Sequence, residues 1–450
     1  MLSSFQVMLT IPTQSSSASA LNDPQPCPVK APCSCDSSTI TCSNLIQREF
    51  PTFTKVKATW YCWTLVMNYN YNITIIPAGA FDNVPLCSLY IDHNSFAVMQ
   101  DGALKGSEPY LHSVFMRFNK FKEVPNEIAR MPNITMLSIH DNPITTLPEK
   151  MAFAPTLEFL DIGSPEMTTW PYSIQTLKKV WSLSVFKFPM PDLPMNAFEG
   201  LENVVLSVTF QSTHLKVIPK ALNRLRNMTE LTISDNIELT SEGITDDAFS
   251  AMGTLKNIYI SNTSLTRVPN LSNNTILTQL SLANSPISRW DASTLPDQSL
   301  LQSVDLSFTN FDHIPAVLKN VKSLTQLRLE HSKVLQIESS DLEGLQKLSY
   351  IYLSYSPLEN ISMDAFKDTH ILQVLYLDYT KLSGLPRAIE RLPAPRFVGL
   401  QNISIECSCA ELGWMKNWIG LKQAPDFGGE CHNNDMYLVD YIQNEIPKCP

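Results

Sequence analysis

The residues with the clearest chemical potential are ten cysteines, because paired cysteines either form disulfides or bind zinc. They are Cys27, Cys33, Cys35, Cys42, Cys62, Cys87, Cys407, Cys409, Cys431 and Cys449. The close pairs have C-x-C spacing, whereas zinc sites usually have two residues between the cysteines, and no histidine lies at ligand spacing in the first group. We therefore predict disulfides over a metal site, and with them an oxidising compartment.

Catalytic motifs are the second kind of chemistry to look for. The sequence contains no Gly-x-Ser-x-Gly motif, no His-Glu-x-x-His motif and no Gly-Lys-Ser/Thr. Two polar pairs, His140-Asp141 and Glu330-His331, are expected where predicted strands end, and solvated side chains are the ordinary case there. We predict no enzymatic activity, no catalytic residue, no metal site and no cofactor.

Composition excludes further classes of function. Only 14 of the 450 residues are Gly, and no G-x-G phosphate loop is present. The formal net charge of −10 leaves no basic surface for nucleic acid or for an anionic membrane. With 44% hydrophobic residues the chain is able to fold around a core, and no apolar run is long enough to span a membrane.

The elements that must position these residues follow a repeat. Apolar residues recur at offsets 0, 3, 5, 10 and 13 of a frame that restarts every 22 to 27 residues. Complete frames start at Leu111, Ile134, Leu157, Val180, Val205, Met228, Leu255, Leu277, Leu301, Leu324, Leu348 and Leu372, with less regular copies near Cys62 and Leu86. The chain therefore consists of about fourteen coils.

Each coil contains one predicted strand. Offsets 3 and 5 lie two residues apart, so both side chains point into the core while offsets 4 and 6 point outward. Stacked coils bury a continuous core that one coil cannot bury alone. The L-x-x-L-x-L pattern is identified as the leucine-rich repeat. We predict an α/β repeat fold: a leucine-rich-repeat solenoid with a curved parallel sheet on the concave side, short helices, 3-10 or irregular turns on the convex side, and disulfide caps.

Offset 8 predicts how neighbouring coils are bonded, because an Asn amide there can reach backbone groups of the adjacent coil. Asn94, Asn119, Asn142 and Asn236 occupy this offset, while Thr263, Ser285, Thr309, Ser332, Ser356 and Thr380 replace them further along, and Pro165 and Phe188 break the pattern. We expect a regular first half, a disturbed stretch near residues 163–215 and a second half bonded by hydroxyls. Short helical turns are expected in the returning segments, both the Ala-Phe type (196–201, 363–366) and the Pro-led type (314–318).

The two cysteine groups lie where a solenoid must be closed. Four cysteines allow three pairings, which spacing leaves open. The C-x5-C-x-C-x6-C run after Pro26 resembles the N-terminal cap of extracellular leucine-rich-repeat proteins, and Cys407-Ser-Cys409 followed by Trp414, Trp418, Cys431 and Cys449 resembles their C-terminal cap. The resemblance implies the bonds Cys27 to Cys35, Cys33 to Cys42, Cys407 to Cys431 and Cys409 to Cys449. Cys62 and Cys87 fall at offsets 0 and 1 of adjacent coils, which favours a fifth disulfide over two buried thiols.

The chain divides into four predicted parts. They are an imperfect signal peptide and leader (1–26), an N-terminal cysteine cap (27–57), the repeats (58–400) and a C-terminal cysteine cap (401–450). The leader has a short apolar core and an Ala18-Ser19-Ala20 cleavage site but no basic segment. These features predict a secreted, extracellular protein.

A narrower likeness concerns Asn72-Ile73-Thr74-Ile75-Ile76-Pro77 followed by Ala80-Phe81. This segment is similar to segments of secreted arthropod proteins named after the non-catalytic subunit of Oplophorus luciferase. The resemblance implies a non-enzymatic subunit or binding partner. We predict a secreted protein that recognises an extracellular protein partner through its concave face. The alternatives are the ectodomain of a membrane receptor or adhesion protein that stops before its transmembrane segment, and a non-catalytic subunit of an extracellular enzyme.

The predicted binding row consists of outward side chains in the last coils. Its members are Arg328, Glu330, Tyr350, Tyr352, Tyr355, Tyr376, Asp378 and Tyr379. Tyr and Arg are common anchors of protein interfaces, although Tyr also simply favours strands. A second aromatic group in the early coils comprises Tyr90, Phe115, Arg117, Phe118 and Phe159.

Eight Asn-x-Ser/Thr sequons predict N-glycosylation. They are Asn72, Asn133, Asn227, Asn262, Asn270, Asn273, Asn360 and Asn402. Asn262 falls at offset 7, on the rim of the concave face, where a glycan would cover the polar middle of the sheet. The C-terminal tyrosines are expected to stay free of glycans.

Overall fold

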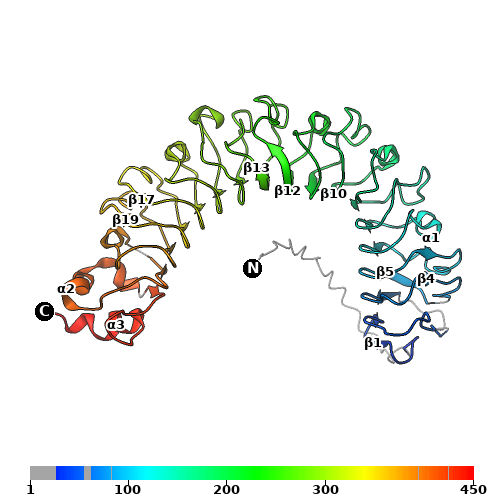
Figure 1. The fold of residues 1–450 in the computed structure, drawn as a ribbon, viewed down its shortest axis with the longest axis horizontal. Helices are drawn as coiled ribbons and strands as arrows, with labels where there is room; N and C mark the ends of the chain where they lie inside the picture. Colours follow the sequence, from blue (N-terminus) through cyan, green and yellow to red (C-terminus); the bar gives the residue numbers. More distant parts are fainter. Residues whose placement is uncertain (1–26, 55–61, 83, 394, 424) are drawn as a thin grey trace, which may run out of the picture.

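The chain winds into an open arc whose strands line the inner side (Figure 1). The computed structural model describes residues 27–54, 62–82, 84–393, 395–423 and 425–450, and the predicted leader lies outside them. Each coil adds one strand to a single curved sheet, and each strand is parallel to the previous one except in the first hairpin. This architecture is the predicted leucine-rich-repeat solenoid.

The inner sheet runs through both caps. Its strands are β1 (Ser34–Asp36), β2 (Thr39–Thr41), β3 (Trp63–Val66), β5 (Leu86–Tyr90), β7 (Ser113–Phe115), β8 (Met136–Ser138), β9 (Phe159–Ile162), β10 (Ser182–Phe186), β11 (Ser207–Gln211), β12 (Glu230–Thr240), β13 (Asn257–Ser264), β14 (Gln279–Ser281), β15 (Ser303–Asp305), β16 (Gln326–Arg328), β18 (Tyr350–Tyr352), β20 (Val374–Tyr376), β21 (Phe397–Gly399) and β22 (Asp426–Phe427). Two short parallel pairs lie on the outer side, β4 (Ile75–Ile76) with β6 (Val98–Met99) and β17 (Gln336–Ile337) with β19 (Asn360–Ile361).

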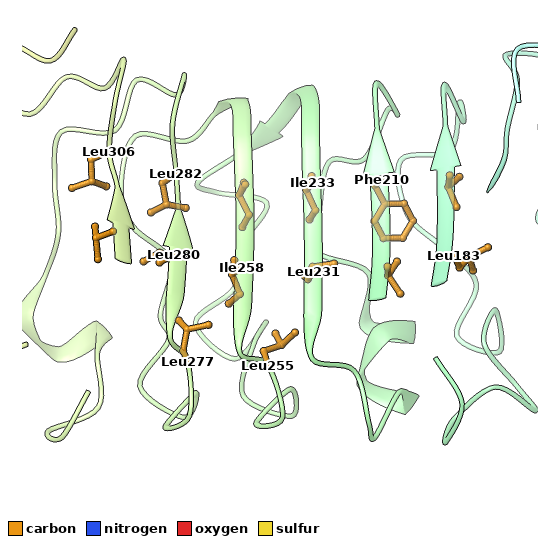
Figure 2. Packing of buried hydrophobic residues seen from close by; sticks show 14 of the residues in the cluster. Leu183, Phe210, Leu231, Ile233, Leu255, Ile258, Leu277, Leu280, Leu282 and Leu306 are labelled. Carbon is orange, nitrogen blue, oxygen red and sulfur yellow. The ribbon is translucent and has the colours of Figure 1, made fainter. Parts of the chain in front are cut away.

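The core follows the repeat because equal offsets of successive coils lie side by side. Leu231 pairs with Ile258, and Ile258 pairs with Leu280, so the inward side chains form continuous rows (Figure 2). Leu231, Ile233 and Ile258 are fully buried. Full burial of one such side chain contributes about 1.5 to 3 kcal/mol, which is why the frame tolerates few polar residues at offsets 3 and 5.

Five returning segments form a helix directly after a Pro, whereas the segments after Pro77, Pro148, Pro194 and Pro269 are not helical. These helices are α1 (Asn126–Ala129), η1 (Tyr172–Thr176), η2 (Lys220–Arg224), η4 (Ala316–Asn320) and η5 (Arg387–Arg391), each of which begins directly after a Pro. The expectation of helical turns is wrong for the Ala-Phe segments, which form non-helical turns with bonds such as Ala197 N–H to Pro194 C=O, 2.9 Å. The first Ala-Phe segment also follows a Pro, Pro194, so a preceding Pro alone does not make a returning segment helical. One further 3-10 turn is η3 (Ala292–Thr294).

Buried amides bond neighbouring coils in the first half. Asn119 donates from Nδ2 to the Ile91 carbonyl, 2.7 Å, and accepts from the Phe96 N–H, 3.1 Å, both in the preceding coil. Asn70 occupies the same position one coil before Asn94 and is also fully buried. In the second half the hydroxyl of Ser356 donates to the Leu329 carbonyl, 3.0 Å, and so replaces part of this bonding.

The expected disturbance near residues 163–215 is wrong for the sheet. Strands β9 to β12 pair in continuous register through this stretch. Ser164, one position before Pro165, is buried and donates to the Ile144 carbonyl, 3.1 Å, while Phe188 enters the core. The irregular residues at offset 8 therefore change the turns of these coils and leave the strand pairing intact.

Disulfides close both ends of the solenoid. The bonds are Cys27–Cys35, Cys33–Cys42, Cys62–Cys87, Cys407–Cys431 and Cys409–Cys449, the same pairing that the cap resemblance and the coil offsets predict. The C-terminal cap contains α2 (Cys409–Leu412), η6 (Gly413–Asn417), η7 (Ile419–Gln423), α3 (Leu438–Asn444) and η8 (Ile446–Lys448). Trp418 covers the last coil and donates from Nε1 to the Leu392 carbonyl, 3.0 Å.

Candidate functional site: two columns of stacked aromatic side chains

Most coils expose the side chain at offset 7, where the strand ends in a left-handed turn; the exceptions include the buried Ser164. The backbone φ at this position lies between 48° and 63° from Tyr69 to Tyr379, and in one coil Gly163 takes it up one residue earlier. In the middle coils Asp235, Asn262 and Asn284 hold the turn, and such residues tolerate this conformation best. Aromatic residues hold it at both ends of the arc, which places their rings along one rim of the concave face.

The rim ladder of the C-terminal arm consists of Phe308, His331, Tyr355 and Tyr379. Neighbouring rings are nearly parallel, with centroid distances of 4.1 Å, 4.5 Å and 4.6 Å in that order. Phe308 and Tyr355 are about half exposed, at 50% and 49%. Because each ring covers the faces of its neighbours, the ladder presents ring edges and tyrosine hydroxyls to solvent.

The inner stack runs beside this ladder at offset 4. The Arg328 guanidinium lies 4.4 Å from the Tyr352 ring centroid, and Tyr352 stacks on Tyr376 at 5.2 Å. Phe397 of the next coil meets Tyr376 at 4.9 Å with a tilt of 45°. The inner stack therefore begins with the Arg328 guanidinium and continues with the rings of Tyr352, Tyr376 and Phe397.

Carboxylates lie between the two columns, at offset 6. Glu330 forms an ion pair with Arg328, and Asp378 accepts from the Gln401 N–H, 2.8 Å, and from the Ser354 hydroxyl, 3.3 Å. Burial raises the pKa of the Tyr352 hydroxyl, so this phenol stays neutral at physiological pH. With Tyr350 exposed at the near edge, all eight predicted partner-binding residues lie on one continuous face.

The early coils carry a second aromatic and polar group. Tyr90 stacks on Phe115 at 4.9 Å, and Arg117 lies over Phe115 at 5.6 Å while it pairs with Asp92 at 2.6 Å. Burial raises the pKa of the Tyr90 hydroxyl, and the charge of Asp92 adds to this rise. His93, between Tyr69 and Phe118, continues a rim ladder of the same kind as in the C-terminal arm. Phe159, the last member of the predicted group, is half-buried on β9.

A partly buried cluster of charged side chains follows these rings. His140 bonds Asp141 from Nδ1 at 2.7 Å and stacks on Phe186 at 4.0 Å, and Lys187 also pairs with Asp141. Burial raises the pKa of the Asp161 carboxyl, whose Oδ1 has no hydrogen-bond partner among the described residues.

No cluster of three metal-ligating side chains is found within the described ranges. Of the polar pair Glu330-His331, Glu330 forms an ion pair with Arg328 and His331 belongs to the rim ladder.

Sequence reasoning missed His93, Phe308, His331 and Phe397 as members of these surfaces, and Asp161 as a buried carboxyl beside them. The first three occupy offset 7, as the predicted Phe118, Tyr355 and Tyr379 do, but a strand pattern of period two assigns this offset to neither face because the chain has already turned. Their signal is the recurrence of Asn and Asp at the same offset in the middle coils, since these residues mark left-handed turns. Phe397 belongs to the coil after the last complete frame, where the repeat passes into the C-terminal cap and the apolar offsets cannot be assigned.

The sequons lie mostly on exposed positions. Asn72, Asn133, Asn227, Asn262, Asn273, Asn360 and Asn402 are exposed, and Asn270 is half-buried. Asn402 takes the left-handed turn of the coil after Tyr379, whose N–H bonds the Gln401 carbonyl at 2.8 Å. A glycan on Asn402 would therefore border the tyrosine face, contrary to the expectation that this face stays free.

Family models agree with this geometry. Residues 346–402 match the model described as leucine rich repeat, and residues 176–289 match a BspA type leucine rich repeat region. The chain is a leucine-rich-repeat solenoid with disulfide-bonded caps. One match covers most of the stretch in which a disturbance was expected and the other covers the coils of Tyr352 and Tyr376, so both lie in the same repeat array.

Relatives and solved structures extend the comparison. The chain is 25% identical to mouse podocan over 60% of its length and 29% identical to bovine fibromodulin over 33%, and each match covers 45% of the relative. The chain thus spans about half the length of these relatives. The structure of the Drosophila Toll and Spätzle complex gives a TM-score of 0.63 at 16% identity, covering 87% of this chain and 61% of that one, which shows the fold alone. Within the described residues no helix is both long and apolar enough to cross a membrane.

Proposed function

We propose that this chain is a secreted, non-enzymatic binding protein that recognises an extracellular protein partner through the concave face of its C-terminal arm. The observation that carries the proposal is the pair of stacked columns, the rim ladder and the inner stack, on one exposed face. The five disulfides support an oxidising, extracellular compartment.

The energetics of the rim ladder support binding over a purely structural role. A left-handed backbone costs a non-Gly residue about 1 to 2 kcal/mol, and a stacked pair returns about 0.5 to 1.5 kcal/mol. Asn at the same position, as at Asn284, avoids the cost and leaves no apolar ring in solvent. The aromatic residues therefore add little to folding and much to a surface that a partner would cover.

Tyrosine removal tests the proposal. Wild-type protein, a Tyr352→Ala/Tyr376→Ala variant and a Tyr172→Ala control are used as baits in the extracellular fluid of the source tissue. Tyr172 is 50% exposed and lies in a returning segment on the convex side, so its loss removes similar surface elsewhere. We expect wild type and control to recover the same protein and the double variant to lose it, with melting temperatures that stay close together. Equal recovery by all three baits rules out this face.

Two alternatives use the same fold. In one the chain is the ectodomain of a membrane receptor or adhesion protein, and in the other it accompanies an extracellular enzyme, as the luciferase-subunit likeness implies. Transcript sequence beyond Pro450 decides the first, and recovery of an enzyme in the bait experiment decides the second.

A further inference from the structure

The rim ladder of the C-terminal arm ends beside an asparagine that begins a sequon. The Tyr379 N–H donates to the Gln401 carbonyl, 2.8 Å, and the Tyr355 N–H makes the equivalent bond one coil earlier. Asn402 then takes the left-handed turn with φ 59°, close to the 57° of Tyr379 and the 62° of Tyr355. Asn402 therefore holds the position at which the next ring of the ladder would stand.

One ring face of Tyr379 lies at the free end of the rim ladder. Among the described residues this ring stacks only on Tyr355, at a centroid distance of 4.6 Å with planes 6° apart. Tyr355, in contrast, lies between His331 and Tyr379. The Tyr379 side chain is 44% exposed. The face of Tyr379 toward Asn402 is therefore apolar surface that no ring in the described ranges covers.

A sugar attached to Asn402 fits this position. N-glycosylation joins N-acetylglucosamine to the amide nitrogen of Asn, so the first sugar starts in the column of the ladder. The hydroxyl groups of this sugar project from the edge of its ring, and its faces present C–H groups. The ladder spacing of 4.1 Å to 4.6 Å admits such a ring as one further member. Stacking removes apolar surface of the sugar and of Tyr379 from water.

A second sequon on the same rim lacks this neighbour. Of the eight sequons, Asn262 and Asn402 hold the left-handed turn. Asn262 lies between Asp235 and Asn284 at the same offset, and its Nδ2 donates to Asp235 at 2.7 Å. A sugar on Asn262 meets polar side chains, whereas a sugar on Asn402 meets the Tyr379 ring. The aromatic contact is therefore specific to the C-terminal end of the arc.

We propose that the first N-acetylglucosamine of a glycan on Asn402 stacks on the open face of Tyr379 and forms the last member of the rim ladder. With its first sugar held in this way, the glycan bounds the tyrosine face at that end of the rim. The assignment needs only the secreted compartment of the proposed function and adds a carbohydrate contact beside its partner face.

Release of the glycan from the native protein tests the contact. The whole protein, secreted by a mammalian cell line, is incubated with peptide-N-glycosidase F in heavy-oxygen water, which converts each released Asn to a labelled Asp. Mass spectrometry then gives the rate of release at each sequon. This enzyme cuts the bond between the first sugar and Asn, so a first sugar that is stacked on a ring should be released more slowly.

Two variants of Tyr379 separate the ring from the fold. Tyr379→Asn removes the ring and keeps the turn, since Asn284 holds the same conformation, while Tyr379→Phe keeps the ring and removes the hydroxyl. We expect release at Asn402 to be about fivefold faster in Tyr379→Asn than in wild type and to change less than about twofold in Tyr379→Phe. The other occupied sequons are the internal reference, and their rates should be equal in the three proteins.

Three results overturn the proposal. They are equal release at Asn402 in wild type and Tyr379→Asn, equally fast release in Tyr379→Phe and Tyr379→Asn, and no glycan on Asn402 where other sequons are occupied. Each of them leaves the proposed function standing, because partner recovery in the bait experiment is a separate measurement. Equal recovery by all three baits instead rejects the partner face and leaves the sugar contact standing.

Discussion

Replacement of Asn119 by Ala tests how strongly buried amides tie coils together. The Asn119 amide donates to the Ile91, Met116 and Arg117 carbonyls at 2.7, 3.2 and 3.1 Å, and its oxygen accepts from the Phe96 N–H at 3.1 Å. Ala leaves the buried Phe96 N–H without a partner, which costs about 1 to 3 kcal/mol. Ala also removes the three bonds that the amide donates, and part of the roughly 0.5 to 1.5 kcal/mol that each such bond contributes is lost. We expect a loss of about 3 kcal/mol.

Thr309→Val is the matched control. The Thr309 hydroxyl holds the same offset, is equally buried and donates to the Leu306 carbonyl of its own coil at 2.6 Å. Val has nearly the same shape, so the expected loss is about 1 kcal/mol. Urea unfolding followed by tryptophan fluorescence gives both free energies, provided that the slope with denaturant is unchanged. Equal losses for the two variants, or a loss below about 1 kcal/mol for Asn119→Ala, would refute the reasoning.

Two further predictions concern buried positions. Burial raises the pKa of Asp161, so the folded state holds the carboxyl proton more tightly than the unfolded state does. The contribution of Asp161 to the free energy of unfolding therefore falls as pH rises from about 4, the pKa in the unfolded chain, toward the raised pKa of the folded state. Asp161→Asn should remove that fall and leave the variant at least as stable at pH 7, as pH-dependent melting will show; a variant that loses stability at pH 7 contradicts this. Gly163→Ala places a Cβ against the Phe186 backbone at φ 124° and should cost several times more than Gly102→Ala, whose Cβ meets nothing within 4 Å, in the same urea assay; similar costs would show that the turn relaxes.

The sequence predicts the sheet better than the surface. Offsets 3 and 5 must be apolar in every coil, so Leu231 and Ile258 reveal their register directly. The bonding between coils at offset 8 can also be predicted from the sequence, because an Asn that is buried in each coil, such as Asn119, must form hydrogen bonds there. The caps follow from cysteine spacing together with the family resemblance.

The stacked columns are harder to predict because they depend on backbone geometry. Tyr355 stacks on His331 only because both residues share a left-handed turn, and period-two alternation does not extend into that turn. The same pattern misplaces the disturbance around Pro165, since Ser164 takes over its role through a one-residue shift. The position of Gly399 beside Tyr376, where the inner stack loses its ring, follows from the register of β20 and β21 and not from the apolar frame.

The locked ends have a consequence for how this protein comes apart. In a stack of coils each unit contacts only its neighbours, and an end coil usually opens first because it has one interface to lose. Here Cys33–Cys42 and Cys409–Cys449 hold the end units closed by covalent bonds. Opening must then start at an internal coil, where two interfaces break at once. The coils between Thr263 and Thr380 are the weakest place for this event, because hydroxyls join them only in part: Thr263 bonds Ser285 of the next coil, whereas Thr309 and Thr380 bond carbonyls of their own coils. Proteolysis of the intact protein should therefore begin there and spread in both directions.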